Sequence, residues 1–179
     1  KSIIAIVAPA IASQFAGIKI EKVVKAIKML GFTDVVEAAL GADIVTKNEA
    51  KELVEKGVLT SSCCPAFVSY IKKFRPELKK YISHNPSPMV QTAMLLKEKN
   101  PDAVTVFIGP CIAKKGEKNE DNAKPYIDYV LSFVELRALF AAKNIELNDI
   151  DGDEMDQATT FGRNFARSGG LAEAVTQEL

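Results

Sequence analysis

The sequence has 179 residues, of which 47% are hydrophobic, so one chain of this length can bury a core of its own. Its 23 Lys and Arg residues balance its 23 Asp and Glu residues, and this zero net charge argues against a nucleic-acid partner. The longest apolar runs, such as residues 2–12, are too short to cross a bilayer, which argues against a membrane partner.

Short apolar stretches alternate with longer segments of helical periodicity, a pattern typical of an α/β fold with a mostly parallel sheet flanked by helices. We expect strands at residues 2–7, 33–37, 58–61, 104–108 and 127–130. We expect helices at residues 20–30, 42–56, 65–74, 88–99 and 133–143. A polar loop at 148–157 should follow, and residues 161–170 should then lead to a short closing helix. Gly31 and Gly57 mark the ends of the first two helices.

The chain contains three cysteines. An odd number at irregular spacing is not a disulfide framework and fits a reducing compartment, in which thiols serve as ligands or reagents. No charged head with a small-residue cleavage site precedes the first apolar run. We therefore expect a cytoplasmic location.

Two cysteines are adjacent in TSSCCPAF, residues 60–67, and the third lies in GPCIAKKGE, residues 109–117. Both stretches follow a predicted strand, and the ligands of open α/β sheets gather at the carboxyl ends of strands. The residues alone also allow small buried hydrophobic side chains, a vicinal disulfide or a zinc site. The zinc site would use Cys63, Cys64, His84 and Cys111, although adjacent residues seldom both reach one tetrahedral ion.

The second stretch adds a cation and a carboxylate to its thiol. Lys114 follows Cys111 by three residues, and Glu117 follows Lys114 by three more. If the segment turns helically, this spacing puts all three side chains on one side. We then expect a thiolate, an ammonium group and a carboxylate to share one small volume.

Together the two stretches resemble the first two signature motifs of the iron-only, or [FeFe], hydrogenases. The usual forms are Thr-Ser-Cys-Cys-Pro, followed two positions later by an aromatic residue, and Pro-Cys-x-x-Lys-x-x-Glu. The second motif fits letter for letter, and the first fits with Ser61 in the threonine place and Phe67 as the aromatic residue. Supporting matches run from VAPA, residues 7–10, to RSGGLAEAV, residues 167–175, and so cover nearly the whole chain.

The resemblance implies part of an enzyme that interconverts H2 with protons and electrons at an H-cluster. This cofactor is a cysteine-bound [4Fe-4S] cube joined to a two-iron unit with carbon monoxide, cyanide and dithiolate ligands. By position, Cys64 and Cys111 match ligands of the cube, Cys63 matches the thiol that passes protons, and Lys114 matches the donor to a cyanide ligand. The other cofactor-binding positions implied by the resemblance are Ala8, Pro9 and Pro88.

The resemblance also implies a proton relay. Glu49 and Glu52, spaced i and i+3 on a predicted helix, match its two carboxylates, and Ser83 matches the hydroxyl group between the motifs. Solvated glutamates and a helix-ending serine are the ordinary alternatives for these residues. Glu117 matches a motif glutamate that orients Lys114 or serves a second proton route.

Three positions depart from the best-studied hydrogen-producing members. Those members have a hydroxyl residue, a glutamine and a methionine where this chain has Ala10, Met89 and Gly109. Such substitutions resemble those in branches proposed to sense hydrogen, so a hydrogen-sensing relative with low turnover is an alternative. A noncatalytic iron-sulfur protein is a further alternative, and the intact Lys114, Glu49, Glu52 and Cys63 argue against it.

A [4Fe-4S] cube needs four thiolates, and this chain has three cysteines, one of them assigned to proton transfer. We therefore expect residues 1–179 to be a partial H-cluster domain without the third cysteine motif and the ferredoxin-like segments. On its own the chain would hold no cofactor and would be inactive, and in the intact protein a ferredoxin-like donor or domain would supply electrons. His84 has no assigned role and is expected at the surface.

Overall fold

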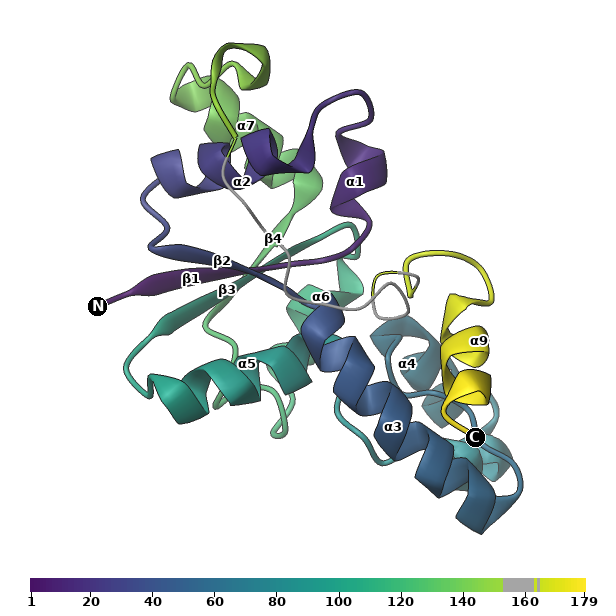
Figure 1. The fold of residues 1–179 in the computed structure, drawn as a ribbon. Helices are drawn as coiled ribbons and strands as arrows, with labels where there is room; N and C mark the ends of the chain where they lie inside the picture. The colour runs from purple at the N-terminus through teal and green to yellow at the C-terminus, as the bar shows by residue number, and fades with distance from the viewer. Residues whose placement is uncertain (153–162, 164) are drawn as a thin grey trace.

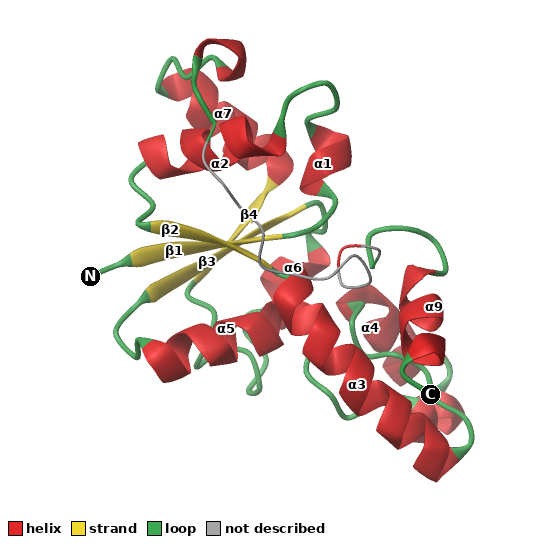
Figure 2. Cartoon of the chain, viewed as in Figure 1, coloured by secondary structure: helices red, strands yellow, loops and turns green. Residues whose placement is uncertain are grey.

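The computed structural model describes residues 1–152, 163 and 165–179 (Figure 1). Its centre is a four-stranded parallel sheet made of β1 (Ile3–Val7), β2 (Asp34–Glu37), β3 (Val104–Gly109) and β4 (Tyr129–Ser132), in the order β2-β1-β3-β4. The register pairs Ile6 of β1 with Val36 of β2 on one side and with Phe107 of β3 on the other. The α/β class and the mostly parallel sheet are thus confirmed (Figure 2).

Helices cover both faces of this sheet, as Figure 1 shows. The chain contains α1 (Ile11–Gln14), α2 (Ile20–Met29), α3 (Ala39–Lys56), α4 (Pro65–Phe74), α5 (Pro88–Lys99), α6 (Ala113–Glu117), α7 (Phe133–Ala142) and α9 (Gly170–Gln177), with 3-10 turns at Pro76–Tyr81 (η1) and Leu147–Asp149 (η2). α1, α2 and α7 lie on one side and α5 on the other, while α3 runs from the end of β2 towards α4 and α9.

The core explains why these segments form these elements. β1 and β3 are central, and in a parallel sheet covered on both faces the central strands read as continuous apolar runs. Ala5, Ile6 and Ile108 are accordingly fully buried. α2 turns a stripe that includes Val23 and Ile27 into the same core, which is the 3.6-residue periodicity seen in the sequence.

One predicted strand is wrong. Residues 58–61 form only an isolated parallel bridge, in which Thr60 pairs with Ile82. α3 points away from the sheet, and Gly57 ends it with a left-handed backbone at φ 73°. The chain therefore emerges beside the segment after η1, where the Thr60 N–H donates to the Tyr81 carbonyl at 2.7 Å, and not at the sheet edge.

Other boundaries shift by a few residues. β4 lies at Tyr129–Ser132 instead of 127–130, because the Ile127 N–H still closes a turn onto the Ala123 carbonyl. α3 begins three residues earlier than expected, and the short elements α1, η1 and η2 were not predicted. Of the predicted loop at 148–157, residues 153–157 fall outside the described part, as do residues 161, 162 and 164 of the segment 161–170. α9 confirms the closing helix.

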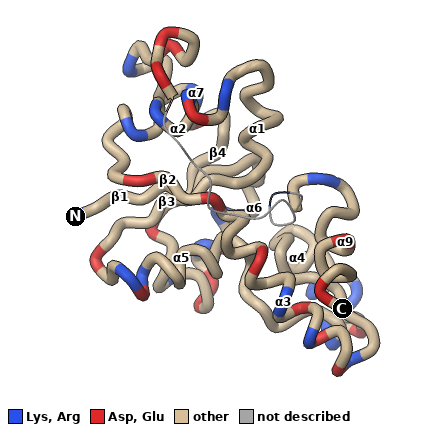
Figure 3. Tube along the Cα trace, in the orientation of Figure 1, with Lys and Arg blue, Asp and Glu red and all other residues tan. Residues whose placement is uncertain are grey.

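Positive and negative side chains are mixed along the described chain, without a long stretch of one sign. Figure 3 shows Lys and Arg interspersed with Asp and Glu along the described chain, as the balanced composition predicts. Within the described residues, no helix combines the length and the apolar character needed to cross a bilayer.

Candidate functional site

The first cysteine pair lies at the start of α4. Pro65 occupies the first helical turn, where its missing N–H is no loss. Cys64 is the N-cap residue, and its Sγ accepts a hydrogen bond from the Phe67 N–H at 3.5 Å. Cys63 is partly buried, whereas Cys64 is exposed. The two neighbouring thiols therefore occupy different environments.

The second motif follows the carboxyl end of β3. Cys111 comes two residues after β3 ends, and α6 begins two residues later and packs against α4. The helical turn brings the Lys114 ammonium within 2.6 Å of the Glu117 Oε2 atom, as the spacing predicts. Both side chains are buried, and a buried charge requires a partner of this kind.

A cavity of about 230 Å3 opens where these segments meet the sheet. The residues that line it are Ala8, Pro9, Ala10, Ala38, Ala42, Cys63, Pro88, Met89, Phe107, Pro110, Cys111, Lys114, Phe165 and Ala166. Six of the predicted positions thus line one cavity, although they come from four separate regions of the sequence. Cys64, Glu49, Glu52, Ser83 and Glu117 do not line this cavity.

The three positions at which the sequence departs from the best-studied hydrogen-producing enzymes lie at this cavity or next to residues that line it. Ala10 and Met89 both line the cavity. At Gly109 an added Cβ would lie 2.7 Å from the Phe107 ring and 3.2 Å from the Ala8 Cβ, so the phenyl ring occupies the space that a side chain would need. The cavity wall is consequently mostly apolar, with one ammonium group and two thiols.

Lys114 is the only charged residue on this wall among the described residues. Its side chain is mostly buried, and its Nζ donates to the Cys63 carbonyl at 3.1 Å as well as to Glu117. An ammonium group has three N–H donors. One donor therefore remains for a group inside the cavity.

A series of hydrogen-bonding side chains extends from Glu52 on α3, through Ser83, Glu49 and Ser61, to Cys63. The Ser83 hydroxyl donates to Glu52 Oε2 at 2.9 Å, and Ser83 also interacts with Glu49. The Ser61 hydroxyl donates to Glu49 Oε1 at 2.8 Å and accepts the Cys63 N–H at 3.1 Å. Neither glutamate is a solvated surface residue: Glu49 is 2% exposed, and the Glu52 side chain is 11% exposed.

The pKa values of these groups move in opposite directions. Burial raises the pKa of Glu49, and hydrogen bonds from Ser61 and Ser83 only partly offset this effect. Burial also acts upward on the pKa of Glu52, but hydrogen bonds from Lys56, Ser83 and the His84 N–H outweigh it and lower that pKa. The inner carboxyl group is therefore the weaker acid of the two.

The pKa of the Cys63 thiol is raised, with burial as the largest cause. The Ser61 hydroxyl and Lys114 oppose this shift, while the charges of Glu49 and Cys64 add to it. Cys63 is thus held as a neutral thiol at neutral pH, in a form that can carry a proton.

Sequence reasoning missed two members of this hydrogen-bonded group. Ser61 was seen only as the motif's threonine place, yet its hydroxyl links Glu49 to Cys63. Asn85 had no signal in the sequence, and its Nδ2 donates to Glu52 Oε2 at 2.9 Å and to the Ser83 hydroxyl at 3.0 Å. These contacts depend on the loop after η1 lying against α3.

Neither a vicinal disulfide nor a zinc site forms among the described residues. All three cysteines are free thiols. Over the ranges 1–152, 163 and 165–179, no three His, Cys, Asp or Glu side chains lie close enough to hold a metal ion, so the zinc site is not formed. His84 is at the surface as predicted, with 83% of its side chain exposed and its Nδ1 3.3 Å from Glu52 Oε1.

The fold and the site define a class of protein: an α/β domain that presents cysteine thiols and a buried lysine at the carboxyl ends of parallel strands. Comparison with known families gives the specific assignment. The model of the family "iron only hydrogenase large subunit, C-terminal domain" matches residues 1–179. The chain belongs to this family.

Individual relatives include enzymes and assembly factors. Iron hydrogenase 1 of Clostridium pasteurianum is 28% identical over 175 residues, which is 86% of this chain and 30% of the relative. The cytosolic Fe-S cluster assembly factor NAR1 of Candida dubliniensis is 34% identical over 113 residues, or 56% of this chain and 19% of that protein. The chain thus spans less than a third of either relative.

Among solved structures, the apo [FeFe]-hydrogenase HydA1 from Chlamydomonas reinhardtii, variant C377H, superposes with a TM-score of 0.82 at 27% identity. The match covers 99% of this chain and 53% of that one. The parallel sheet and its helices are therefore those of an [FeFe]-hydrogenase domain, and the chain spans about half the length of the solved protein.

Proposed function

We propose that this chain is part of an [FeFe] hydrogenase that interconverts H2 with protons and electrons at an H-cluster. The observation that carries the proposal is the meeting of Cys63, Cys111 and Lys114 on the wall of one mostly apolar cavity. Family membership supports the same chemistry.

Cysteine thiolates are the ligands that a [4Fe-4S] cube requires, and the cysteines of this chain are free thiols. In this proposal Cys64 and Cys111 bind iron of the cube, and the Phe67 N–H stabilises the Cys64 thiolate by its hydrogen bond to Sγ. When bound, the cofactor supplies the redox-active iron at which hydrogen is made or split. A cube takes four thiolates, so two more would come from outside residues 1–179, and the chain alone would remain apo and inactive.

Lys114 and the apolar wall hold the cavity side of the cofactor in place. The remaining Lys114 N–H would donate to an anionic ligand such as cyanide, while Glu117 fixes the direction of the ammonium group. Ala8, Pro9 and Pro88 shape the wall and exclude water. These roles follow from the charge and position of each residue.

Proton movement uses the hydrogen-bonded groups behind the cavity. A proton would pass from Glu52 to the Ser83 hydroxyl, which also contacts Glu49, and from Glu49 to the Ser61 hydroxyl, which contacts the Cys63 thiol as well as accepting the Cys63 N–H. The raised pKa of Glu49 suits the inner position, because a carboxyl group there must hold a proton before passing it on.

The test uses the intact protein that contains this chain, matured without oxygen. We expect carbon monoxide and cyanide bands in its infrared spectrum and hydrogen formation with reduced viologen. Cys63→Ala should keep the bands and lose about 10²- to 10⁴-fold in turnover, the usual contribution of a proton-transferring group, whereas Cys64→Ala should lose iron. Glu49→Gln should likewise keep the bands and lower turnover, whereas Glu55→Gln, its matched control at an exposed α3 position outside the relay, should leave turnover unchanged. Unchanged turnover in Cys63→Ala would overturn the assignment.

Ala10 and Met89 on the cavity wall favour a second candidate, a hydrogen-sensing relative with low turnover. In that case the infrared bands would respond to H2 while hydrogen formation stays low. A noncatalytic iron-sulfur protein, which the NAR1 similarity suggests, would lack the bands altogether. The same two measurements therefore separate all three functions.

The remaining assignments are also proposals. A ferredoxin-type donor or domain would exchange electrons with the cube, with H2 and protons as the other partners. A cytoplasmic location is proposed because three unpaired thiols suit a reducing compartment.

A further inference from the structure

A second, polar cleft lies on the opposite side of the Lys114–Glu117 ion pair. It has a volume of about 250 Å3 and is lined by Ser62, Pro65, Val68, Lys72, Lys79, Ile82, Ser83, His84, Asn85, Ser87, Glu117, Glu120 and Asn122. Glu117 lines this cleft and Lys114 lines the apolar cavity, so the ion pair stands between the two spaces. Of these residues the proposed hydrogenase function uses only Ser83 and Glu117, and it assigns no role to the space that they line.

Ser87 gives the first sign that the cleft holds a ligand. This residue is 3% exposed, and its Oγ is buried without any hydrogen-bond partner in the described structure. A buried hydroxyl without a partner is unfavourable, because it has lost its hydration without gaining a hydrogen bond. Ser87 is also the N-cap residue of α5, yet its side chain does not cap the helix, in contrast to Ser132 of α7.

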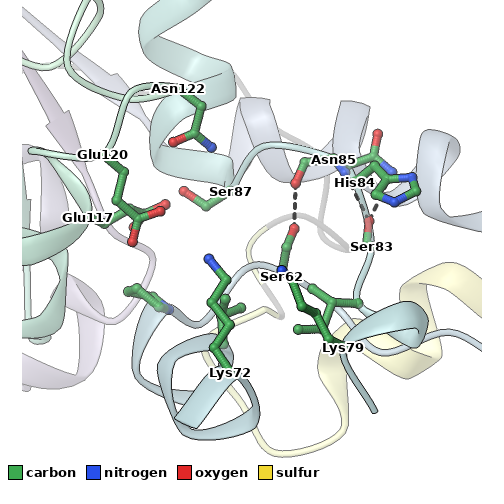
Figure 4. Close-up of a pocket in the computed structure, with 13 residues that line it drawn as sticks. Ser62, Lys72, Lys79, Ser83, His84, Asn85, Ser87, Glu117, Glu120 and Asn122 are labelled. Carbon is green, nitrogen blue, oxygen red and sulfur yellow. Dashed lines mark hydrogen bonds between the residues drawn. The ribbon is translucent and has the colours of Figure 1, made fainter. Parts of the chain in front are cut away.

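The hydroxyl instead points into the cleft. Figure 4 shows its oxygen directed towards the space beside Glu117 and Glu120, with the Asn122 amide on the same side. The Asn122 side chain makes no hydrogen bond to any residue that the structure describes, and Glu117 uses only its Oε2 atom, for Lys114. The buried Ser87 hydroxyl thus shares this space with the exposed Asn122 amide and with one carboxylate oxygen of Glu117 that has no described partner.

The charges on the two walls have opposite signs. α6 and the turn after it supply Glu117 and Glu120, whereas α4 supplies Lys72 and η1 supplies Lys79. In Figure 4 the Lys72 side chain extends towards the acidic wall. Neither lysine side chain forms an ion pair or a hydrogen bond with a described residue, so the two walls face each other without closing.

We propose that this cleft binds a small zwitterion of the size of a free α-amino acid. Its ammonium group would donate to Glu117 and Glu120, and its carboxylate would accept from Lys72 and from the Ser87 hydroxyl. A ligand with a single charge would meet one wall of its own sign, which disfavours simple anions and simple amines. Because the buried Ser87 hydroxyl has no acceptor in the described structure, it favours a ligand that places an acceptor oxygen at that point.

Binding would also act on the cavity. A ligand ammonium on Glu117 would share that carboxylate with Lys114 and so weaken the ion pair that holds the ammonium group of Lys114 at the cavity wall. This consequence rests on the proposed hydrogenase function. Binding itself does not, because it needs no iron.

The experiment is calorimetric titration of the chain without cofactor, with free glycine as the probe and with acetate and methylammonium as its two halves. We expect saturable binding of glycine and at least about tenfold weaker binding of each half, which corresponds to one lost charged contact. Lys72→Met should weaken glycine binding about tenfold, whereas Lys73→Met, the exposed neighbour outside the cleft, should not change it.

Ser87→Ala completes the test. It should weaken glycine binding several-fold without lowering the urea midpoint, because the hydroxyl has no protein partner to lose. No saturation up to about 100 mM glycine, acetate binding as tightly as glycine, or binding unaffected by Lys72→Met would each overturn the proposal. Each of these results leaves the hydrogenase test untouched, so the two failures remain distinguishable.

Discussion

Gly41 offers a quantitative test of the packing that places Glu49 and the other residues of the proposed proton relay. It lies on α3 where that helix meets α5, and its N–H donates to the Thr92 hydroxyl at 3.1 Å. An alanine Cβ at this point would lie well inside contact distance of the Pro88 carbonyl and the Thr92 Oγ1, and 2.8 Å from the Thr92 nitrogen. Backbone atoms of α5 cannot move aside as a flexible side chain can.

The expected effect of Gly41→Ala combines three contributions. Overpacking against backbone lies near the upper end of the usual range, about 3 kcal/mol. Loss of the hydrogen bond to Thr92 adds about 1 kcal/mol, and the better helix propensity of alanine returns about 1 kcal/mol. We therefore expect a net loss of about 3 kcal/mol in the free energy of unfolding, or about 6–12 °C in Tm for a chain of this size.

The assay is urea and thermal unfolding of the chain, followed by circular dichroism. Gly116→Ala is the matched control, because Gly116 lies on α6 with nothing within 4 Å of the added Cβ. It should stabilise the chain by up to about 1 kcal/mol. If Gly41→Ala proved as stable as the unmodified chain, α3 and α5 would not be in this close contact, and the placement of Glu49 and Pro88 would lose its basis.

Three further changes test individual groups. Burial raises the pKa of Glu49, so protonation of this carboxyl group stabilises the folded chain. This stabilisation is fully present below the ordinary pKa of 4.5 and is lost as the pH rises through the folded-state pKa. Glu49→Gln should therefore gain stability relative to the unmodified chain between about pH 4 and about pH 7 in urea titrations, and a pH-independent difference would contradict this. Iodoacetamide should modify exposed Cys64 before Cys63, whose pKa is raised by burial, as measured by peptide mass spectrometry, and equal rates in the folded chain would show that Cys63 is not protected. Ser132→Ala should lower the free energy of unfolding by about 1 kcal/mol, because the capping box of α7 is lost, and an unchanged urea midpoint would argue that this box is not formed.

The parallel sheet could be predicted because local sequence and global burial agree. β1 is a continuous apolar segment and β3 is interrupted only by Thr105, and such runs are typical of strands covered on both faces. The segment at 58–61 looks similar over a shorter length, yet the direction of α3 carries it away from the sheet. Strand pairing is a tertiary event, and four residues do not determine their own neighbour.

The site was predictable where chemistry follows chain spacing, and not where it follows tertiary contact. Lys114 and Glu117 pair through the i, i+3 spacing of a helix, so the sequence was sufficient. The hydrogen bond from Ser61 to Glu49 joins a loop to α3, and the unpartnered hydroxyl of Ser87 depends on its rotamer at the start of α5. No local pattern encodes either feature.

The adjacency of the two motif cysteines has a geometric explanation. Cys64 has an extended backbone, with φ −105° and ψ 103°, immediately before the helical turn of Pro65. In extended backbone, neighbouring side chains point to opposite sides. Cys63 therefore lines the cavity beside Lys114, while the Cys64 sulfur turns back to the N-terminus of α4 and to the surface. One dipeptide thus gives its two thiols separate surroundings, as the proposed division into a proton carrier and an iron ligand requires, because the pKa of Cys63 responds to burial and to Glu49 while Cys64 is hydrogen-bonded to the start of the helix.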